Sequence, residues 1–361
     1  MAEKRIRNFI FAPPRFLLMP AVGIDISDRS IKYAELIPTS IGHRLGRFGE
    51  ILLEQGLVEN GRIINQSRLT EILANLVKEQ KISFVRAALP EEQIYFYQTH
   101  LPSGTRESLR EAIELGLEDH VPIPVSEAYF DYEIVGSTET ETEVVVSVAS
   151  SIVIQSYADT FKDAGLTLLS LELEAEAETR AVVHNDDKTA TLLVDFGRTR
   201  TGIAIVHEGK VHFTSTVSVG GQMLTETLTK HFGIPSDQAE AMKREFGMRR
   251  NSPHQDLFAL LLNNIAVLRD EINKHFTYWH THKNESGNAR PPIEQIVLIG
   301  GDSNLAGLSE YLSTSLHVTA VRGDVWTNIE LPPKDVPALS KNDSLGYATA
   351  IGLALHDTKY E

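Results

Sequence analysis

The fold is decided by a short pattern that occurs twice, as VGIDIS at residues 22–27 and as LLVDFG at residues 192–197. Each copy is an apolar strand with Asp25 or Asp195 near its end, followed by a short polar turn and a second strand. The two aspartates are 170 residues apart (195 minus 25), so each copy could head one of two lobes. Backbone N–H groups in such turns can cradle phosphate oxygens, and carboxylates can hold Mg²⁺ through its retained waters. Two such turns facing each other would form a phosphate-binding cleft.

A third pattern is IVLIGGDSN at residues 296–304, an apolar strand that runs into Gly300 and Gly301 and then into a helix. Glycine lets the backbone approach a ligand closely, and a helix N-terminus favours anions. Each of the three patterns alone is common in structural turns. Their shared order and spacing are more specific, and together they favour a nucleotide site.

The composition of the 361-residue chain narrows the class of protein. Hydrophobic residues make up 42% and charged residues 23%, which is ordinary for a soluble globular protein with two cores. The absence of cysteine excludes disulfides, iron–sulfur clusters and thiolate zinc sites. A net charge of -15 argues against nucleic acid as the main partner. The sequence contains no run of about 18 apolar residues, so it predicts no membrane-spanning helix.

Alternating strand and helix periodicities predict an α/β protein. Among the expected elements are strands at 22–26, 84–89 and 295–299 and helices at 103–117, at 236–246 and from near Leu305. The expected division is a basic and apolar leader (1–20), a first lobe (21–84), an inserted α+β subdomain (85–170) and a second lobe (171–361), whose C-terminal helix can pack back on the first lobe. The leader is either a mobile segment or an anchor to a membrane surface or partner groove.

The three patterns resemble the two phosphate motifs and the adenosine motif of the actin–Hsp70–sugar kinase superfamily. This resemblance implies a two-lobed actin-like (RNase H-like) ATPase fold with a small inserted subdomain, and ATP and Mg²⁺ as cofactors. It also implies that Asp25 and Asp195 hold Mg²⁺ through water. The positions that match nucleotide contacts of the family are Asp25, Ser27, Ser30, Lys32, Asp195, Gly197, Thr199, Thr201, Gly220, Gly221, Glu240, Lys243, Gly300, Gly301 and Asn304.

Two features of this set leave alternatives open. Glu240 and Lys243 share a helical face, so they are either nucleotide contacts or a solvated charge pair. Several residues also depart from the small side chains that are usual in these motifs, so nucleotide binding is either retained or weakened to the point of loss. The departures are Ser27, Asp28 and Arg29 in the first turn, Arg198 and Arg200 in the second, and Asp302 in the adenosine motif.

Within the superfamily, the sequence resembles the PilM family of type IV pilus assembly proteins, with the FtsA family second. The likeness is carried by VRAALP at 85–90, EDHVPIP at 118–124, EAYFDY at 127–132 and AGL at 164–166. It implies a cytoplasmic, ATP-binding scaffold, peripheral at the inner membrane, that binds the N-terminal peptide of a PilN-like membrane protein. The candidate surface lies within residues 85–124. Other pilus platform and motor components are implied as further partners.

Two other functions remain open at this point. One is a filament-forming cell-division protein that resembles FtsA, and the other is a small-molecule kinase or ATPase of the same superfamily. Hydrolysis needs a polar group that orients the attacking water. No residue of this sequence is identified for that role, so a weak ATPase activity stays undecided.

Overall fold

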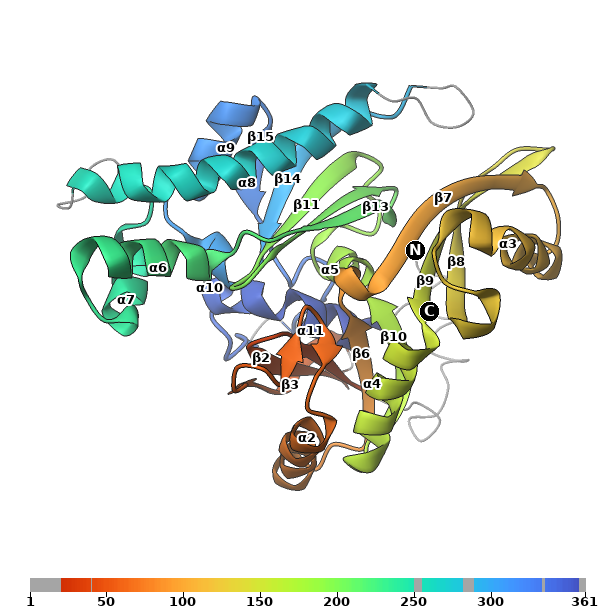
Figure 1. The fold of residues 1–361 in the computed structure, drawn as a ribbon, viewed down its shortest axis with the longest axis horizontal. Helices are drawn as coiled ribbons and strands as arrows, with labels where there is room; N and C mark the ends of the chain where they lie inside the picture. The colour runs from red at the N-terminus through yellow and green to blue at the C-terminus, as the bar shows by residue number, and fades with distance from the viewer. Residues whose placement is uncertain (1–20, 40, 250–254, 282–288, 333–334, 357–361) are drawn as a thin grey trace.

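The computed structural model describes residues 21–39, 41–249, 255–281, 289–332 and 335–356. These residues form two lobes, each built on a five-stranded sheet, and a smaller three-stranded unit beside them (Figure 1). The expected leader at residues 1–20 lies outside the described residues. None of the described helices is long and apolar enough to cross a membrane.

The first lobe is a mixed sheet with the strand order β10-β6-β1-β2-β3. Its strands are β1 (Val22–Ile26), β2 (Ser30–Thr39), β3 (Gly42–Leu52), β6 (Phe84–Leu89) and β10 (Thr167–Leu173). Strand β1 pairs antiparallel with β2 and parallel with β6, so it lies in the middle and is buried along its whole length. Helices α2 (Gln66–Gln80) and α4 (Ser151–Asp163) cover one face.

The second lobe repeats this arrangement with the strand order β13-β12-β11-β14-β15. Its strands are β11 (Ala190–Phe196), β12 (Thr201–His207), β13 (Lys210–Val217), β14 (Ile293–Ile299) and β15 (Thr319–Arg322). Helices α6 (Gly221–Phe232), α7 (Ser236–Phe246), α8 (Gln255–Thr281) and α9 (Leu308–Leu316) contribute to the core on one face. Along β11, Leu192 and Val194 face this core while Leu193 faces the opposite one, as the two-residue period of a strand requires.

Two helices lie between the sheets, α5 (Glu174–Val182) and α11 (Ala348–Ala354). Their side chains share one core with β2 of the first lobe and with β11 and β14 of the second. The backbones meet closely, because a Cβ on Gly23 would lie 1.9 Å from the Ala350 carbonyl oxygen and a Cβ on Gly352 would lie 1.8 Å from that of Ala177. The C-terminal helix α11 therefore packs on β1 and α5, between the two halves of the molecule.

The three-stranded unit is antiparallel, with the order β7-β9-β8. It contains β7 (Ile94–Pro102), β8 (Ala128–Ser137), β9 (Glu141–Ser150) and helix α3 (Arg106–His120), which packs on one face of the sheet. The short helix η2 (Glu91–Gln93) connects it to β6. The range 85–170 thus contributes β6, α4 and part of β10 to the first lobe as well. We call residues 94–150 the insert.

Candidate functional site

A cavity of about 820 Å³ opens between the lobes where both polar turns end. This volume lies within the range of small-molecule sites, roughly 300–1,000 Å³. Most of the predicted nucleotide contacts line it, namely Asp25, Ser27, Ser30, Lys32, Asp195, Gly197, Thr199, Glu240, Lys243, Gly300, Gly301 and Asn304. The remaining three, Thr201, Gly220 and Gly221, are not part of the lining.

The first turn, between β1 and β2, is closed by its own serines. The Ser27 hydroxyl accepts a hydrogen bond from the Ser30 N–H (3.2 Å) and donates one to the Ser30 carbonyl (3.1 Å). A side chain where the superfamily has glycine therefore fits this turn. Lys32 lies opposite Asp25 in the β1–β2 register, and it also approaches Glu50 at 3.7 Å.

The second turn, between β11 and β12, is supported from behind by the three residues that do not reach the cavity. The buried Thr201 hydroxyl donates to the Val219 carbonyl at 2.6 Å. The Gly221 N–H donates to the Gly197 carbonyl at 3.0 Å. A Cβ on Gly220 would lie 2.5 Å from the Arg198 carbonyl oxygen, so glycine is needed for α6 to start against the turn.

The carboxylates of Asp25 and Asp195 lie deep in the cavity and influence each other. Burial, followed by the charge of Asp25, raises the pKa of Asp195 from 3.8 to about 6. Burial also raises the pKa of Asp25, while the charges of Lys32 and Arg200 oppose this. Among the described residues, no group of three or more His, Cys, Asp or Glu side chains could hold a metal ion directly. Two carboxylates that repel each other fit Mg²⁺, which keeps several waters and needs few protein ligands.

The diglycine bend brings the third pattern against the second turn. Gly300 has φ +87°, and a Cβ there would lie 2.2 Å from Oδ1 of Asp195. A Cβ on Gly301 would meet no atom within 4 Å, so this residue presents open backbone to the cavity. The chain continues as the short helix η4 (Gly301–Asn304), and the Asn304 side chain donates to the Asn342 carbonyl at 2.7 Å.

Glu240 and Lys243 of α7 form a buried ion-pair network, not a solvated pair. Lys243 is 2% exposed, and its Nζ lies 2.6 Å from Oδ1 of Asp302, 2.8 Å from Oε2 of Glu240 and 3.1 Å from the Gly221 carbonyl oxygen. Burial would raise the pKa of Glu240, but the hydrogen bonds and charge of Lys243 outweigh it and hold the pKa at about 2. Asp302 thus fills space at this end of the cavity, where the superfamily has glycine.

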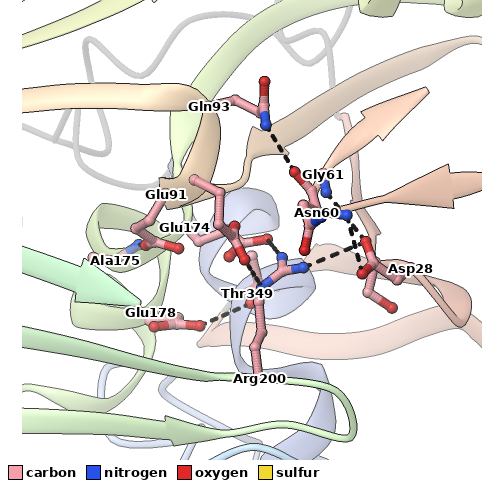
Figure 2. A network of polar contacts seen from close by, with 12 residues as sticks. Asp28, Asn60, Gly61, Glu91, Gln93, Glu174, Ala175, Glu178, Arg200 and Thr349 are labelled. Atoms are coloured by element: carbon pink, nitrogen blue, oxygen red, sulfur yellow. Dashed lines mark hydrogen bonds and ion pairs between the residues drawn. The ribbon is translucent and has the colours of Figure 1, made fainter. Parts of the chain in front are cut away.

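The sequence did not single out the acidic residues that α5 contributes. Glu174 and Glu178 line the cavity, and the Glu178 carboxylate accepts a hydrogen bond from the Thr349 hydroxyl at 3.2 Å. Arg200, noted above only as a bulky departure, lies among Asp28, Glu92 and Glu174 (Figure 2). In the sequence, Glu174 and Glu178 could have been noticed from their i, i+4 spacing on a helix that is otherwise rich in alanine.

Comparison with solved structures identifies the same architecture elsewhere. The structure of a PilM–PilN type IV pilus biogenesis complex is similar with a TM-score of 0.79 at 20% identity, over 94% of this chain and 99% of that chain. MreB5 of Spiroplasma citri bound to ADP is similar with a TM-score of 0.54 at 13% identity, over 93% of this chain and 96% of that chain. These likenesses show the two-lobed actin-like fold.

Sequence comparison is more specific. The cell division protein FtsA of Neisseria meningitidis is 28% identical over 109 residues, which are 30% of this chain and 26% of FtsA. FtsA of Pseudomonas aeruginosa is 24% identical over 210 residues, 53% of this chain and 48% of FtsA. The chain thus matches a quarter to about a half of these relatives. Residues 23–358 match the family described as type IV pilus assembly protein PilM. The chain therefore belongs to the PilM family of actin-like type IV pilus assembly proteins.

Proposed function

We propose that this protein is an ATP-binding scaffold of the type IV pilus machinery, held at the cytoplasmic face of the inner membrane by the N-terminal peptide of a PilN-like membrane protein. The observation that carries the nucleotide part is the convergence of Asp25, Asp195 and Gly300 on one cavity between the lobes. Patterns that are separated by up to 275 residues (300 minus 25) would not meet there in an unrelated fold.

In this proposal the phosphates lie against the turns at 27–30 and 197–200, whose residues line the cavity together with Lys32. Turns of this kind can hold phosphate oxygens with backbone N–H groups. Asp25 and Asp195 hold Mg²⁺ through water, which relieves the repulsion between them. The adenosine lies toward Gly301 and the Lys243 network. The MreB5 structures, bound to ADP and to AMPPNP, support nucleotide binding in this fold.

The partner part of the proposal rests on the complex of PilM with PilN among the similar structures. Within the candidate surface at residues 85–124, Leu115 of α3 is 88% exposed and Tyr95 of β7 is 42% exposed. We infer that these two side chains contribute to the contact with the peptide. A peptide bound here would tether the protein to the membrane, and other platform and motor components would join through it.

Titration calorimetry of the purified protein with Mg·ATP tests the nucleotide part. We expect saturable binding that requires magnesium. Heats indistinguishable from dilution at millimolar Mg·ATP would reject it. A pull-down with the N-terminal peptide of the PilN-like protein, compared with a scrambled peptide, tests the partner part separately. We expect Leu115→Ser to reduce capture and Val336→Ser, at an exposed site outside the insert and the cavity lining, to leave it unchanged.

A further inference from the structure

Three consecutive residues at the base of the insert each contact a different part of the molecule, and Figure 2 shows the first and the third of them, Glu91 and Gln93. All three form the short helix η2. Oε1 of Glu91 accepts a hydrogen bond from the Ala175 N–H of α5 (2.9 Å). Oε1 of Glu92 pairs with Nε of Arg200 in the second turn (2.8 Å). Nε2 of Gln93 donates a hydrogen bond to the Asn60 carbonyl of the first lobe (2.8 Å). This helix is therefore a junction between the insert and both lobes.

Arg200 lies in the wall between this junction and the cavity. Its side chain is 15% exposed, and it shares its guanidinium among Glu92 (2.8 Å), Glu174 (3.4 Å) and Asp28 (3.5 Å). Arg200 and Glu174 line the cavity, whereas Glu92 and Asp28 are not part of the lining. One guanidinium thus faces the phosphate turns on one side and the base of the insert on the other.

Loss of the Arg200 contact would affect Glu92 more than Asp28, because the Glu92 contact is the shortest of the three. Asp28 is held independently, because its carboxylate also accepts hydrogen bonds from the Gly61 N–H (3.1 Å) and the Asn60 N–H (3.2 Å). Oε2 of Glu92 is buried and has no hydrogen-bond partner within the described part of the chain. A phosphate group can accept two parallel, charge-assisted hydrogen bonds from a guanidinium, whereas Arg200 contacts each of its three carboxylates through a single nitrogen.

We propose that Arg200 couples the cavity to the insert: a phosphate-bearing ligand draws the guanidinium away from Glu92 and thereby loosens η2. This inference rests on the nucleotide binding proposed above. Coupling between two equilibria is reciprocal. Removing the charge of Glu92 must therefore free Arg200 for phosphate and tighten ligand binding, although Glu92 does not line the cavity.

The test is the Mg·ATP affinity of Glu92→Gln, which keeps the size of the side chain and removes its charge. We expect binding about fivefold tighter than in the wild type, the factor for one partly buried ion pair. The comparison variant is Gln93→Ala, which weakens the same junction but does not free the Arg200 guanidinium, so it should tighten binding much less than Glu92→Gln does. In an Arg200→Lys background the effect of Glu92→Gln should shrink, whereas a general charge effect would persist.

Hydrogen exchange gives a second readout that needs no variant. Saturating Mg·ATP should speed amide exchange at the start of β7, directly after η2, relative to the free protein. Equal affinity in wild type and Glu92→Gln, together with unchanged exchange in β7, overturns the coupling but leaves nucleotide binding intact. Absence of Mg·ATP binding in both proteins rejects the nucleotide proposal itself and the coupling with it.

Discussion

Oδ1 of Asp195 lies 2.2 Å from the position that a Cβ on Gly300 would occupy, so the bend after β14 reaches the second phosphate turn only because residue 300 is glycine. Gly300 also has φ +87°, which side-chain-bearing residues rarely adopt. We expect Gly300→Ala to lower the free energy of unfolding by about 1–3 kcal/mol and to weaken Mg·ATP binding. Chemical denaturation and calorimetry measure the two effects.

The neighbouring Gly301 supplies the control for this prediction. A Cβ there would meet nothing within 4 Å, so Gly301→Ala should change stability by less than about 0.5 kcal/mol. If both variants behave alike, the contact between Gly300 and Asp195 does not have the structural role assigned to it.

The buried Asp195 should make the protein less stable than it could be. The pKa of Asp195 is higher in the folded protein than in the unfolded chain, so its protonated form favours the fold. This contribution to the free energy of unfolding is lost as the pH rises from about 4 to about 6. We expect Asp195→Asn to raise the free energy of unfolding at pH 7.5 by roughly 1–3 kcal/mol while it weakens Mg·ATP binding. Urea denaturation at pH 4 and pH 7.5 checks this. A variant less stable than the wild type at both pH values would contradict the assigned repulsion.

Glu172 should have the opposite pH dependence. Burial acts to raise its pKa, but the hydrogen bond with His356 and the charge of Arg180 (2.6 Å away) hold the pKa at about 2. Its contribution is therefore present above pH 4.5 and lost as the pH falls toward 2. Glu172→Gln should cost about 2–4 kcal/mol at pH 7 and flatten the acid limb of the stability profile. The control is Glu71, which forms an exposed ion pair with Arg68. Glu71→Gln should cost under about 0.5 kcal/mol of unfolding free energy.

Asp302 gives a prediction in which stability and binding change in opposite directions. Restoring the glycine of the superfamily with Asp302→Gly removes a partner of the buried Lys243, so unfolding free energy should fall by roughly 1–3 kcal/mol. The same change opens the adenosine end of the cavity, so Mg·ATP should bind more tightly. Asp302→Asn keeps the volume, and it should show the stability loss without the gain in affinity. Equal nucleotide affinities in the two variants would argue against occlusion by Asp302.

Local patterns allowed much of this fold to be predicted. Strand β1 and helix α7 have the expected bounds, because strand alternation and helix periodicity are properties of neighbouring residues. Helix α3 begins at Arg106 rather than near Ser103, because the Thr105 hydroxyl accepts the Ser108 N–H and caps it. The helix expected from near Leu305 begins at Leu308, after the short η4.

The tertiary charge networks could not be predicted in this way. Arg200 is distant in sequence from each of its three carboxylate partners, so no local spacing reveals the cluster. The spacing of Glu240 and Lys243 is visible in the sequence, but the burial of Lys243 depends on Asp302, which lies 59 residues further along. Contacts of this kind follow from how the lobes meet.

The position of α11 also has a consequence for synthesis on the ribosome. The face of the first sheet opposite α2 and α4 is covered by a helix that ends at Ala354, although the strand it covers begins at Val22. The earliest strands therefore emerge long before their covering helix is made. Nascent chains of this protein should expose that sheet face to chaperones until translation has passed residue 354.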